Sequence, residues 1–265
     1  MEKEIRIVGV GDNCIDYYEQ TNEAYPGGNP VNVAVYFKRL GGESSYVGAV
    51  GTDEYGNLLI QSLKDKKVDT SHVHVVEGDT AVTHVNMVDG ERVLGDYDEG
   101  VMESFVLNQD DFLYIATHDL VVSALWGRVE KEFSHFKKMG LRTAFDFATQ
   151  LEGEVVDAAI KYTDYAFFSV EDLTEEKIHE FMKKMHLFGP KLVIVTMGKK
   201  GSMVYDGNNF YRFGIISCDV VDTLGAGDSY IAGFLYGILN GQSIEESMEL
   251  GARNSAKTLG YWGAW

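Results

Sequence analysis

The chain has 265 residues, which is enough for one large α/β domain or for a core with a small accessory element. Its 23 basic and 41 acidic residues give a formal charge of −18, which disfavours binding to nucleic acids and to anionic membrane surfaces. The first ten residues, MEKEIRIVGV, lack the apolar core of a signal peptide, and no uncharged apolar run reaches the length of a membrane helix. The two cysteines, Cys14 and Cys218, are far apart and form no disulfide framework, so we expect a cytoplasmic protein.

Short apolar runs alternate with amphipathic stretches along most of the chain. Residues 5–10 predict a buried strand, 30–40 a helix with Pro30 in its first turn, 45–50 a strand, and 56–66 a helix with Leu59 and Leu63 on one face. Further strands are predicted at 119–125, 142–147, 164–168 and 191–196. This alternation indicates a mostly parallel central sheet with helices on both faces.

Two regions break the alternation. Residues 80–97 contain two β-like runs joined at Asp89–Gly90, a dipeptide typical of hairpin turns. A second hairpin is predicted at 202–213, with its turn at 206–209. The first hairpin resembles an appended β element. We therefore predict a single domain over residues 1–265 with a lid formed mainly by about 77–103; surface decoration is the alternative.

A glycine-rich turn, Asp222-Thr223-Leu224-Gly225-Ala226-Gly227-Asp228, precedes a stretch with a helical apolar face. Unpaired N–H groups at a helix start, together with the helix dipole, form an anion site. Glycines at positions 225 and 227 let the backbone approach phosphoryl oxygens. Beside a bound phosphate, Asp228 could accept a proton from an attacking hydroxyl, whereas elsewhere it would be an ordinary helix-start carboxylate.

Together with this turn, three further segments resemble the motifs of the ribokinase family of carbohydrate kinases, also called the phosphofructokinase B family. They are Gly27–Ala34 (G-G-x-x-x-N-x-A), Val50–Gly56 (V-G-x-D-x-x-G) and Thr196–Gly201 (T-x-G-x-x-G), and the resemblance extends over essentially the whole chain. It implies a three-layer α/β ribokinase-like fold with a small β lid, and transfer of the γ-phosphoryl group of ATP to an alcohol, with Mg²⁺ neutralising charge.

The resemblance also implies a role for individual residues. Asp228 would be the catalytic base, and the N–H groups of Gly225, Ala226, Gly227 and Asp228 would stabilise transition-state charge. Asp16 and Asn32 would bind sugar hydroxyls, with Asp12 and Gly28 close by; the alternatives are an Asx-turn for Asp16 and a helix cap for Asn32. Thr196, Gly198 and Gly201 would line the nucleotide site, with Asn254 as a weaker candidate, and Asp222 and the last helix could hold a monovalent cation.

One motif departs from the family pattern. Where relatives have N-x-x-E after a strand, this chain has Ser169-Val170-Glu171-Asp172, so a metal would be held by Glu171 or Asp172 acting through water. This departure favours a catalytically idle sugar-binding module on the same fold, whereas the intact Gly-Ala-Gly turn and Asp228 favour a kinase. Gly9-Val10-Gly11 lacks the third glycine of a dinucleotide fingerprint, and residues 198–201 are not a Walker A loop. His72 and His74 share a strand face without a third ligand, which is typical of solvated surface histidines.

Charge and local resemblance predict the substrate. Residues 7–37 contain no Lys or Arg, and the lid region has a single basic residue, Arg92, which we place among the substrate contacts. The same region contains eight acidic residues, although these could simply face water: Glu77, Asp79, Asp89, Glu91, Asp96, Asp98, Glu99 and Glu103. Such a lining suits an amine better than a second phosphate.

Three segments outside the shared kinase motifs resemble bacterial fructoselysine kinases: Gly95–Met102, Ala124–Gly127 and Gly263–Trp265. Within them Trp126 could stack on the substrate or pack in the core. We therefore predict that fructoselysine is phosphorylated on its 6-hydroxyl. Fructosamines of other amino acids are one alternative, and a neutral ketose or a nucleoside is the main one. A homodimer through the lid is a further expectation.

Overall fold

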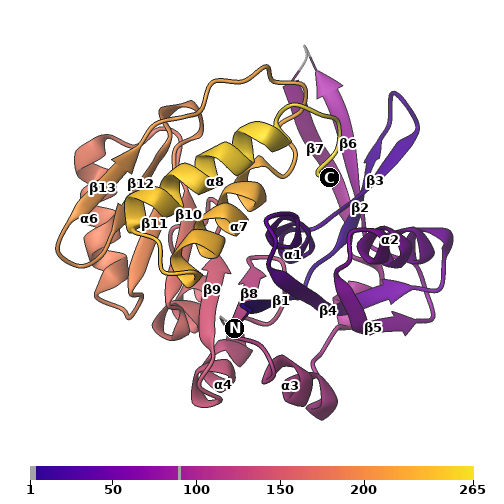
Figure 1. The fold of residues 1–265 in the computed structure, drawn as a ribbon. Coiled ribbons are helices and arrows are strands. Elements are labelled where there is room, and N and C mark those ends of the chain that lie inside the picture. Colours follow the sequence, from indigo (N-terminus) through magenta and orange to yellow (C-terminus); the bar gives the residue numbers. More distant parts are fainter. Residues whose placement is uncertain (1–3, 89–90) are drawn as a thin grey trace.

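The computed structural model describes residues 4–88 and 91–265, and over these ranges the chain forms two sheets, a large one of nine strands and a small one of four (Figure 1). The strands of the large sheet, in their order across it, are β13 (Phe210–Phe213), β12 (Ser202–Tyr205), β11 (Leu192–Thr196), β10 (Tyr165–Ser169), β9 (Arg142–Asp146), β8 (Leu120–Ala124), β1 (Arg6–Val10), β4 (Glu43–Gly51) and β5 (Asp69–Val76). From β11 to β5 every neighbouring pair is parallel, and the β12–β13 hairpin adds an antiparallel edge.

Helices cover both faces of this sheet, because alternate residues of the buried strands face opposite sides. In β4, Tyr46 packs with the helices of one face and Val47 with those of the other. The first face carries α1 (Asn29–Arg39), α2 (Glu54–Asp65), α7 (Ala226–Leu239) and α8 (Ile244–Thr258). The second face carries α3 (Gln109–Ile115), α4 (Phe133–Lys138), α5 (Glu154–Ala159) and α6 (Glu175–His186). Short 3₁₀ helices are η1 (Gly100–Ser104), η2 (Glu130–Glu132), η3 (Ile160–Tyr162) and η4 (Gly198–Lys200).

The predicted three-layer fold is thus confirmed, and each strand and helix named from the sequence is present within a few residues of its expected bounds. The small sheet, in contrast, is larger than the sequence indicated. It has the order β3 (Glu23–Gly27), β2 (Cys14–Tyr18), β6 (Val82–Val88) and β7 (Glu91–Asp98), so two of its four strands come from residues 14–27, outside the predicted 77–103. The expected turn at Asp89–Gly90 lies outside the described residues.

The C-terminal segment, Gly263–Ala264–Trp265, lies beside strands β6 and β7 of the small sheet (Figure 1). Ala264 is fully buried with Tyr18 of β2, Val85 of β6 and Leu224, and Tyr25 and Trp265 pack against this cluster. The backbone N–H of Gly263 donates to the carboxylate of Asp222 at 3.0 Å, and the hydroxyl of Tyr18 donates to the same carboxylate at 2.8 Å. The small sheet is therefore connected to the turn before α7 by polar and apolar contacts.

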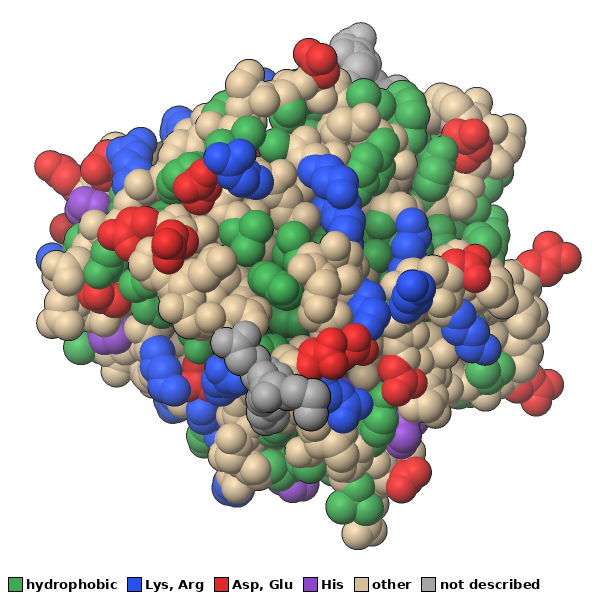
Figure 2. All heavy atoms as spheres, viewed as in Figure 1, with side chains coloured by type: hydrophobic (Ala, Val, Ile, Leu, Met, Phe, Trp, Pro, Cys, Tyr) green, Lys and Arg blue, Asp and Glu red, His purple; other side chains and the backbone are tan. Residues whose placement is uncertain are grey.

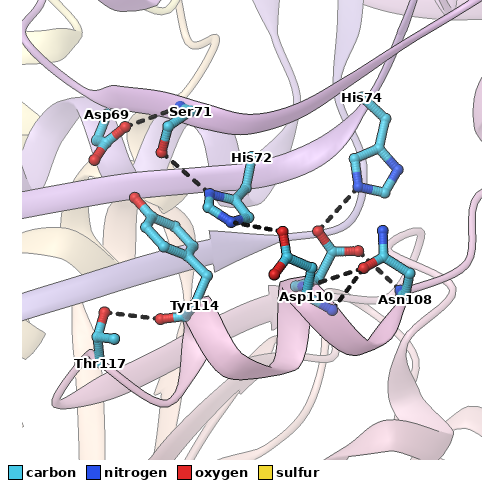
Figure 3. Close-up of polar contacts among 9 residues, drawn as sticks. Asp69, Ser71, His72, His74, Asn108, Asp110, Tyr114 and Thr117 are labelled. Carbon is cyan, nitrogen blue, oxygen red and sulfur yellow. Dashed lines mark hydrogen bonds and ion pairs between the residues drawn. The ribbon is translucent and has the colours of Figure 1, made fainter.

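The two histidines of β5 contact α3 instead of standing free in solvent (Figure 3). His74 Nε2 lies 2.9 Å from a carboxylate oxygen of Asp111, and the His72 ring stacks on Tyr114 with 3.7 Å between centroids. Asn108 caps α3 through the N–H groups of residues 110 and 111. These contacts hold the short helix α3 against the edge strand of the large sheet. Of the helices in the described residues, none is both long and apolar enough to cross a membrane.

Candidate functional site

Polar side chains converge at the carboxyl edge of the parallel strands, where ligands of open α/β sheets bind. Asp12 follows β1 and Asp146 ends β9, while Asn29 and Asn32 lie in the first turn of α1 and Asp228 in the first turn of α7. We call Asp12, Asp16, Asp146 and Asp228 the aspartate cluster. The first three are buried and Asp228 is partly exposed.

Both carboxylate oxygens of Asp228 are held by amide groups of α1. Asn29 Nδ2 donates to Oδ1 at 2.6 Å, and Asn32 Nδ2 donates to Oδ2 at 2.7 Å. The indole N–H of Trp265 donates to Asn32 Oδ1 at 2.7 Å, which fixes the amide so that its NH₂ group faces Asp228. Asn32 therefore holds the carboxylate and is not a helix cap; the cap position is taken by Gly28, whose φ of 104° favours glycine.

Asn29 also joins Asp228 to a second carboxylate. Its Nδ2 donates to Asp146 Oδ2 at 2.7 Å, and its backbone N–H donates to Asp12 Oδ2 at 3.1 Å. Two acceptors of this pair have no partner among the residues that the structure describes, because Asp12 Oδ1 and Asn29 Oδ1 are buried and receive no hydrogen bond from them. Buried acceptors of this kind are rare, and the hydroxyl groups of a bound polyol would satisfy them.

Burial raises the pKa of three carboxyls of the aspartate cluster. Burial raises the pKa of Asp228 to about 8; the carboxylates of Asp146, Asp12 and Asp16 add to the rise, and the Asn32 hydrogen bond opposes it. Burial likewise raises the pKa of Asp12 and of Asp146 to about 6. A carboxyl with a pKa near neutrality, partly open to solvent, is suited to accept a proton from a bound hydroxyl.

The start of α7 offers backbone N–H groups that can bind a negatively charged group. Gly225 is the N-cap with φ 70°, and an added Cβ there would stand 2.3 Å from the hydroxyl of Tyr36. In the described part of the chain, no side chain caps this helix. An added Cβ on Gly227 would meet nothing within 4 Å, so open space lies beside the unpaired N–H groups. An anion can approach the helix start on this side.

The predicted nucleotide loop lies at the ends of β10 and β11. Gly198 (φ 53°) and Gly201 (φ 88°) bound η4, and the hydroxyls of Thr196 and Ser169 lie 2.9 Å apart. The two predicted metal residues, Glu171 and Asp172, are exposed just after Ser169. Among the residues that the structure describes, no group of three or more His, Cys, Asp or Glu side chains could hold a metal ion.

Other predicted site residues have defined surroundings. Asn254 is buried; its Oδ1 accepts from Arg39 at 2.7 Å and its Nδ2 donates to the backbone oxygen of Ser229 at 2.7 Å, so a nucleotide would have to replace one of these bonds. Trp126 is 51% exposed, which rules out the alternative of core packing. The side chain of Arg92 lies outside the described residues.

The sequence did not point to Asn29 or Asp146. Asn29 lies inside the Gly27–Ala34 motif, but at a position that the family pattern leaves open. Asp146 ends a predicted strand, and a carboxylate at the carboxyl end of a parallel strand was a usable signal. Chemically, the assembled residues can hold a polyol against a carboxylate base, with an anion site directly beside that base.

Comparison with known proteins found relatives that match nearly the whole chain. The family model described as pfkB family carbohydrate kinase matches residues 2–264. The fructoselysine 6-kinase of Shigella flexneri is 43% identical over 256 residues, covering 97% of this chain and 98% of that protein. Fructosamine kinase FrlD of Bacillus subtilis (strain 168) is 36% identical over 264 residues, covering 98% and 93%. The structure of Arabidopsis thaliana ribokinase complexed with ribose and ATP matches with a TM-score of 0.86 at 22% identity, covering 99% and 94%, and confirms the fold.

Proposed function

This chain belongs to the pfkB family of carbohydrate kinases, and from that premise we propose that it phosphorylates the 6-hydroxyl of fructoselysine with ATP as the phosphoryl donor. The observation that carries the proposal is the position of Asp228, held between two amides of α1 and beside the open N-terminus of α7. A base and an anion site in contact are the two parts that phosphoryl transfer to an alcohol requires.

In this proposal Asp228 accepts the proton of the substrate hydroxyl as its oxygen forms the new bond to phosphorus. Asn29 and Asn32 orient the carboxylate, and the N–H groups of Gly227 and Asp228 stabilise the charge that develops on the phosphoryl oxygens. Asp12 Oδ1 and Asn29 Oδ1 accept hydrogen bonds from other hydroxyls of the sugar and so set its orientation. Asp16, buried on β2, lies on the side of the small sheet.

ATP, when bound, supplies the transferred phosphoryl group, and Mg²⁺ neutralises its charge. The described residues fit a nucleotide loop built on Thr196, Gly198 and Gly201, next to the ends of β10 and β11. They fit Mg²⁺ as an ion held mainly by phosphates and water, with Glu171 or Asp172 acting through water, because both side chains are exposed. A monovalent cation at Asp222 would share a carboxylate that already accepts three hydrogen bonds, from Tyr18, Leu224 and Gly263.

The substrate assignment has two supports. The relative with 43% identity is named fructoselysine 6-kinase, and the relative with 36% identity is named fructosamine kinase FrlD. The second support is charge: residues 7–37, which include the buried acids Asp12 and Asp16, contain no Lys or Arg, and this composition suits a substrate amine. The acids of the lid region carry less of this argument than the sequence suggested, because Glu77, Asp79, Asp96, Asp98 and Glu103 are exposed to solvent.

We also propose that the small sheet acts as a lid over the site. Its link to the turn before α7, through Tyr18 and Asp222, is a contact that a closing lid would make. A homodimer formed through this sheet stays a prediction, which light scattering on the purified protein would check.

The test is kcat/KM for fructoselysine compared with fructose, ribose and fructose 6-phosphate in a coupled ADP-release assay. Preference for fructoselysine supports the assignment. Preference for a neutral or phosphorylated sugar by about tenfold or more, equal to about 1.4 kcal/mol in transition-state binding, would overturn the substrate and leave the kinase reaction in place. Absence of phosphorylation for every alcohol tried would favour a sugar-binding module on the same fold.

A further inference from the structure

The loop between β8 and η2 contacts the backbone at two places next to the aspartate cluster. The backbone N–H of Leu125 donates to the backbone oxygen of Asp146 at 2.9 Å. Gly127 packs so closely on Gly11 that a Cβ on Gly11 would stand 2.5 Å from Gly127 Cα. Gly11 directly precedes Asp12, so residues 125–128 are fixed next to two members of the aspartate cluster.

The residues on either side of Gly127 are not part of the core. Trp126 is 51% exposed. Arg128 has a φ of 56°, a left-handed conformation that is uncommon for a residue with a side chain and is maintained where the surrounding structure requires it. The loop that contacts Gly11 therefore carries an exposed aromatic side chain and an exposed cationic side chain.

Arg128 forms an ion pair with Glu99, which follows β7 of the small sheet. The two side chains are 44% and 38% exposed, so a ligand can reach them. Tyr97 of β7 pairs with Thr83 of β6, which in turn pairs with Asp16 of the aspartate cluster, so the small sheet connects that cluster to Glu99, two residues after Tyr97.

A free amino acid group has the charges that match this pair. Its ammonium suits a carboxylate and its carboxylate suits a guanidinium, which binds carboxylates in a bidentate manner. An exposed ion pair contributes only about 0–1 kcal/mol to stability. The Glu99–Arg128 pair can therefore separate at little cost, so that Glu99 binds the ammonium and Arg128 the carboxylate of a zwitterion. Trp126, two residues before Arg128 in the same loop and 51% exposed, offers a ring face for the aliphatic chain between sugar and amino acid.

We propose that Glu99 and Arg128 form a subsite that binds the α-ammonium and α-carboxylate groups of the amino acid attached to the sugar. This inference rests on the proposed function and extends it: the sugar end is held by the aspartate cluster, and the amino acid end by an ion pair that joins the small sheet to the loop after β8. The subsite selects sugar adducts with a free α-amino acid group over adducts of simple amines.

Three substrates separate the two charges. Fructoselysine has both, the fructose adduct of 1,5-diaminopentane lacks the α-carboxylate, and the adduct of 6-aminohexanoic acid lacks the α-ammonium. Arg128→Gln should lower kcat/KM about tenfold for the two adducts with a carboxylate, mainly through KM, and leave the diaminopentane adduct unchanged. Glu99→Gln should lower kcat/KM for fructoselysine and the diaminopentane adduct, and spare the 6-aminohexanoic acid adduct.

Arg253→Gln is the matched control, because Arg253 forms a comparably exposed ion pair with Glu249 on α8. It should leave all three kcat/KM values unchanged. If wild-type enzyme prefers fructoselysine but Arg128→Gln lowers kcat/KM equally for all three adducts, the subsite is wrong and the proposed function stands. If wild-type enzyme phosphorylates fructose and none of the adducts, the substrate assignment fails and the subsite fails with it. Thermal unfolding of each variant shows whether a loss common to all substrates comes from misfolding.

Discussion

Replacement of the proposed base by its amide, Asp228→Asn, separates catalysis from stability. The wild-type carboxylate accepts hydrogen bonds from Asn29 and Asn32. An amide at this position cannot accept a proton from the substrate, so kcat should fall by at least about 10²-fold. The amide also cannot accept hydrogen bonds from both asparagines, because its NH₂ end is a donor. The Asn32 amide cannot flip by 180° to compensate, because it would lose the hydrogen bond from Trp265.

Although Asp228→Asn should lower kcat, we expect it to raise the stability of the folded protein near neutral pH. The pKa of Asp228 is raised from 3.8 to about 8 in the folded protein. Between these values the folded carboxyl holds a proton that the unfolded carboxyl releases, so the carboxyl lowers stability increasingly from about pH 4 to pH 8. From the unfolded pKa to pH 7 is about three pH units, and at about 1.36 kcal/mol for each unit the free energy of unfolding is lowered by about 4 kcal/mol at pH 7. The lost hydrogen bond offsets about 1–3 kcal/mol of this, which leaves a variant about 1–3 kcal/mol more stable than wild type at pH 7.

The measurements are kcat in the coupled assay and Tm by scanning fluorimetry at pH 4.5 and pH 7. We expect Tm of Asp228→Asn to rise by about 5 °C at pH 7 and not at pH 4.5, where the penalty has almost disappeared. Asp157→Asn, an exposed first-turn carboxylate of α5, is the control and should change neither quantity appreciably. A variant that keeps wild-type kcat shows that Asp228 is not the base, and a lower Tm at both pH values refutes the reasoning on buried charge.

Three further predictions concern the surroundings of the base. Gly227→Val should keep Tm within a few degrees, because its side chain enters open space, but lower turnover about 10²-fold by blocking an N–H donor; normal turnover per folded molecule would make the turn purely structural. For wild type, kcat/KM should rise with pH towards about 8 as Asp228 loses its proton. Asp146→Asn removes a negative charge near Asp228 and should move this rise to lower pH. An unchanged pH profile would contradict the coupling between the two carboxyls. Trp265→Phe should lower kcat about fivefold, the equivalent of one hydrogen bond, because the Asn32 amide is no longer fixed; a change confined to KM for ATP would contradict this role.

The central fold and the α7 turn could be predicted from the sequence because their signals are local. The apolar runs that mark β1, β4 and β8 are short and contiguous, and the Gly-Ala-Gly turn stands directly before the helix that it begins. Strands β2 and β3 carried no such signal. Each has five residues, and β3 (EAYPG) contains both Pro and Gly, which disfavour strands in general but are accepted at the edge of a sheet.

The contacts that define the site could not be predicted, because they join distant parts of the chain. The pairing of Arg128 with Glu99 depends on how the small sheet folds back on the loop after β8. In the same way the partners of His72 and His74 lie on α3, so periodicity along β5 alone suggested solvent. Gly225 and Gly227 look equivalent in the sequence, yet a Cβ on Gly225 would collide with Tyr36 while one on Gly227 would meet only open space.

The hydrogen bonds to Asp228 come from residues 199 and 196 positions earlier in the chain. Contacts of such sequence separation form late in folding, after most of the loop-closure entropy has been lost. An α7 helix that folds with α8 alone would present the glycine-rich turn without an oriented base, and α1 with its strands would present asparagines without a carboxylate to hold. If Asp228 is the base, as proposed, phosphoryl transfer requires that both halves of the chain have docked.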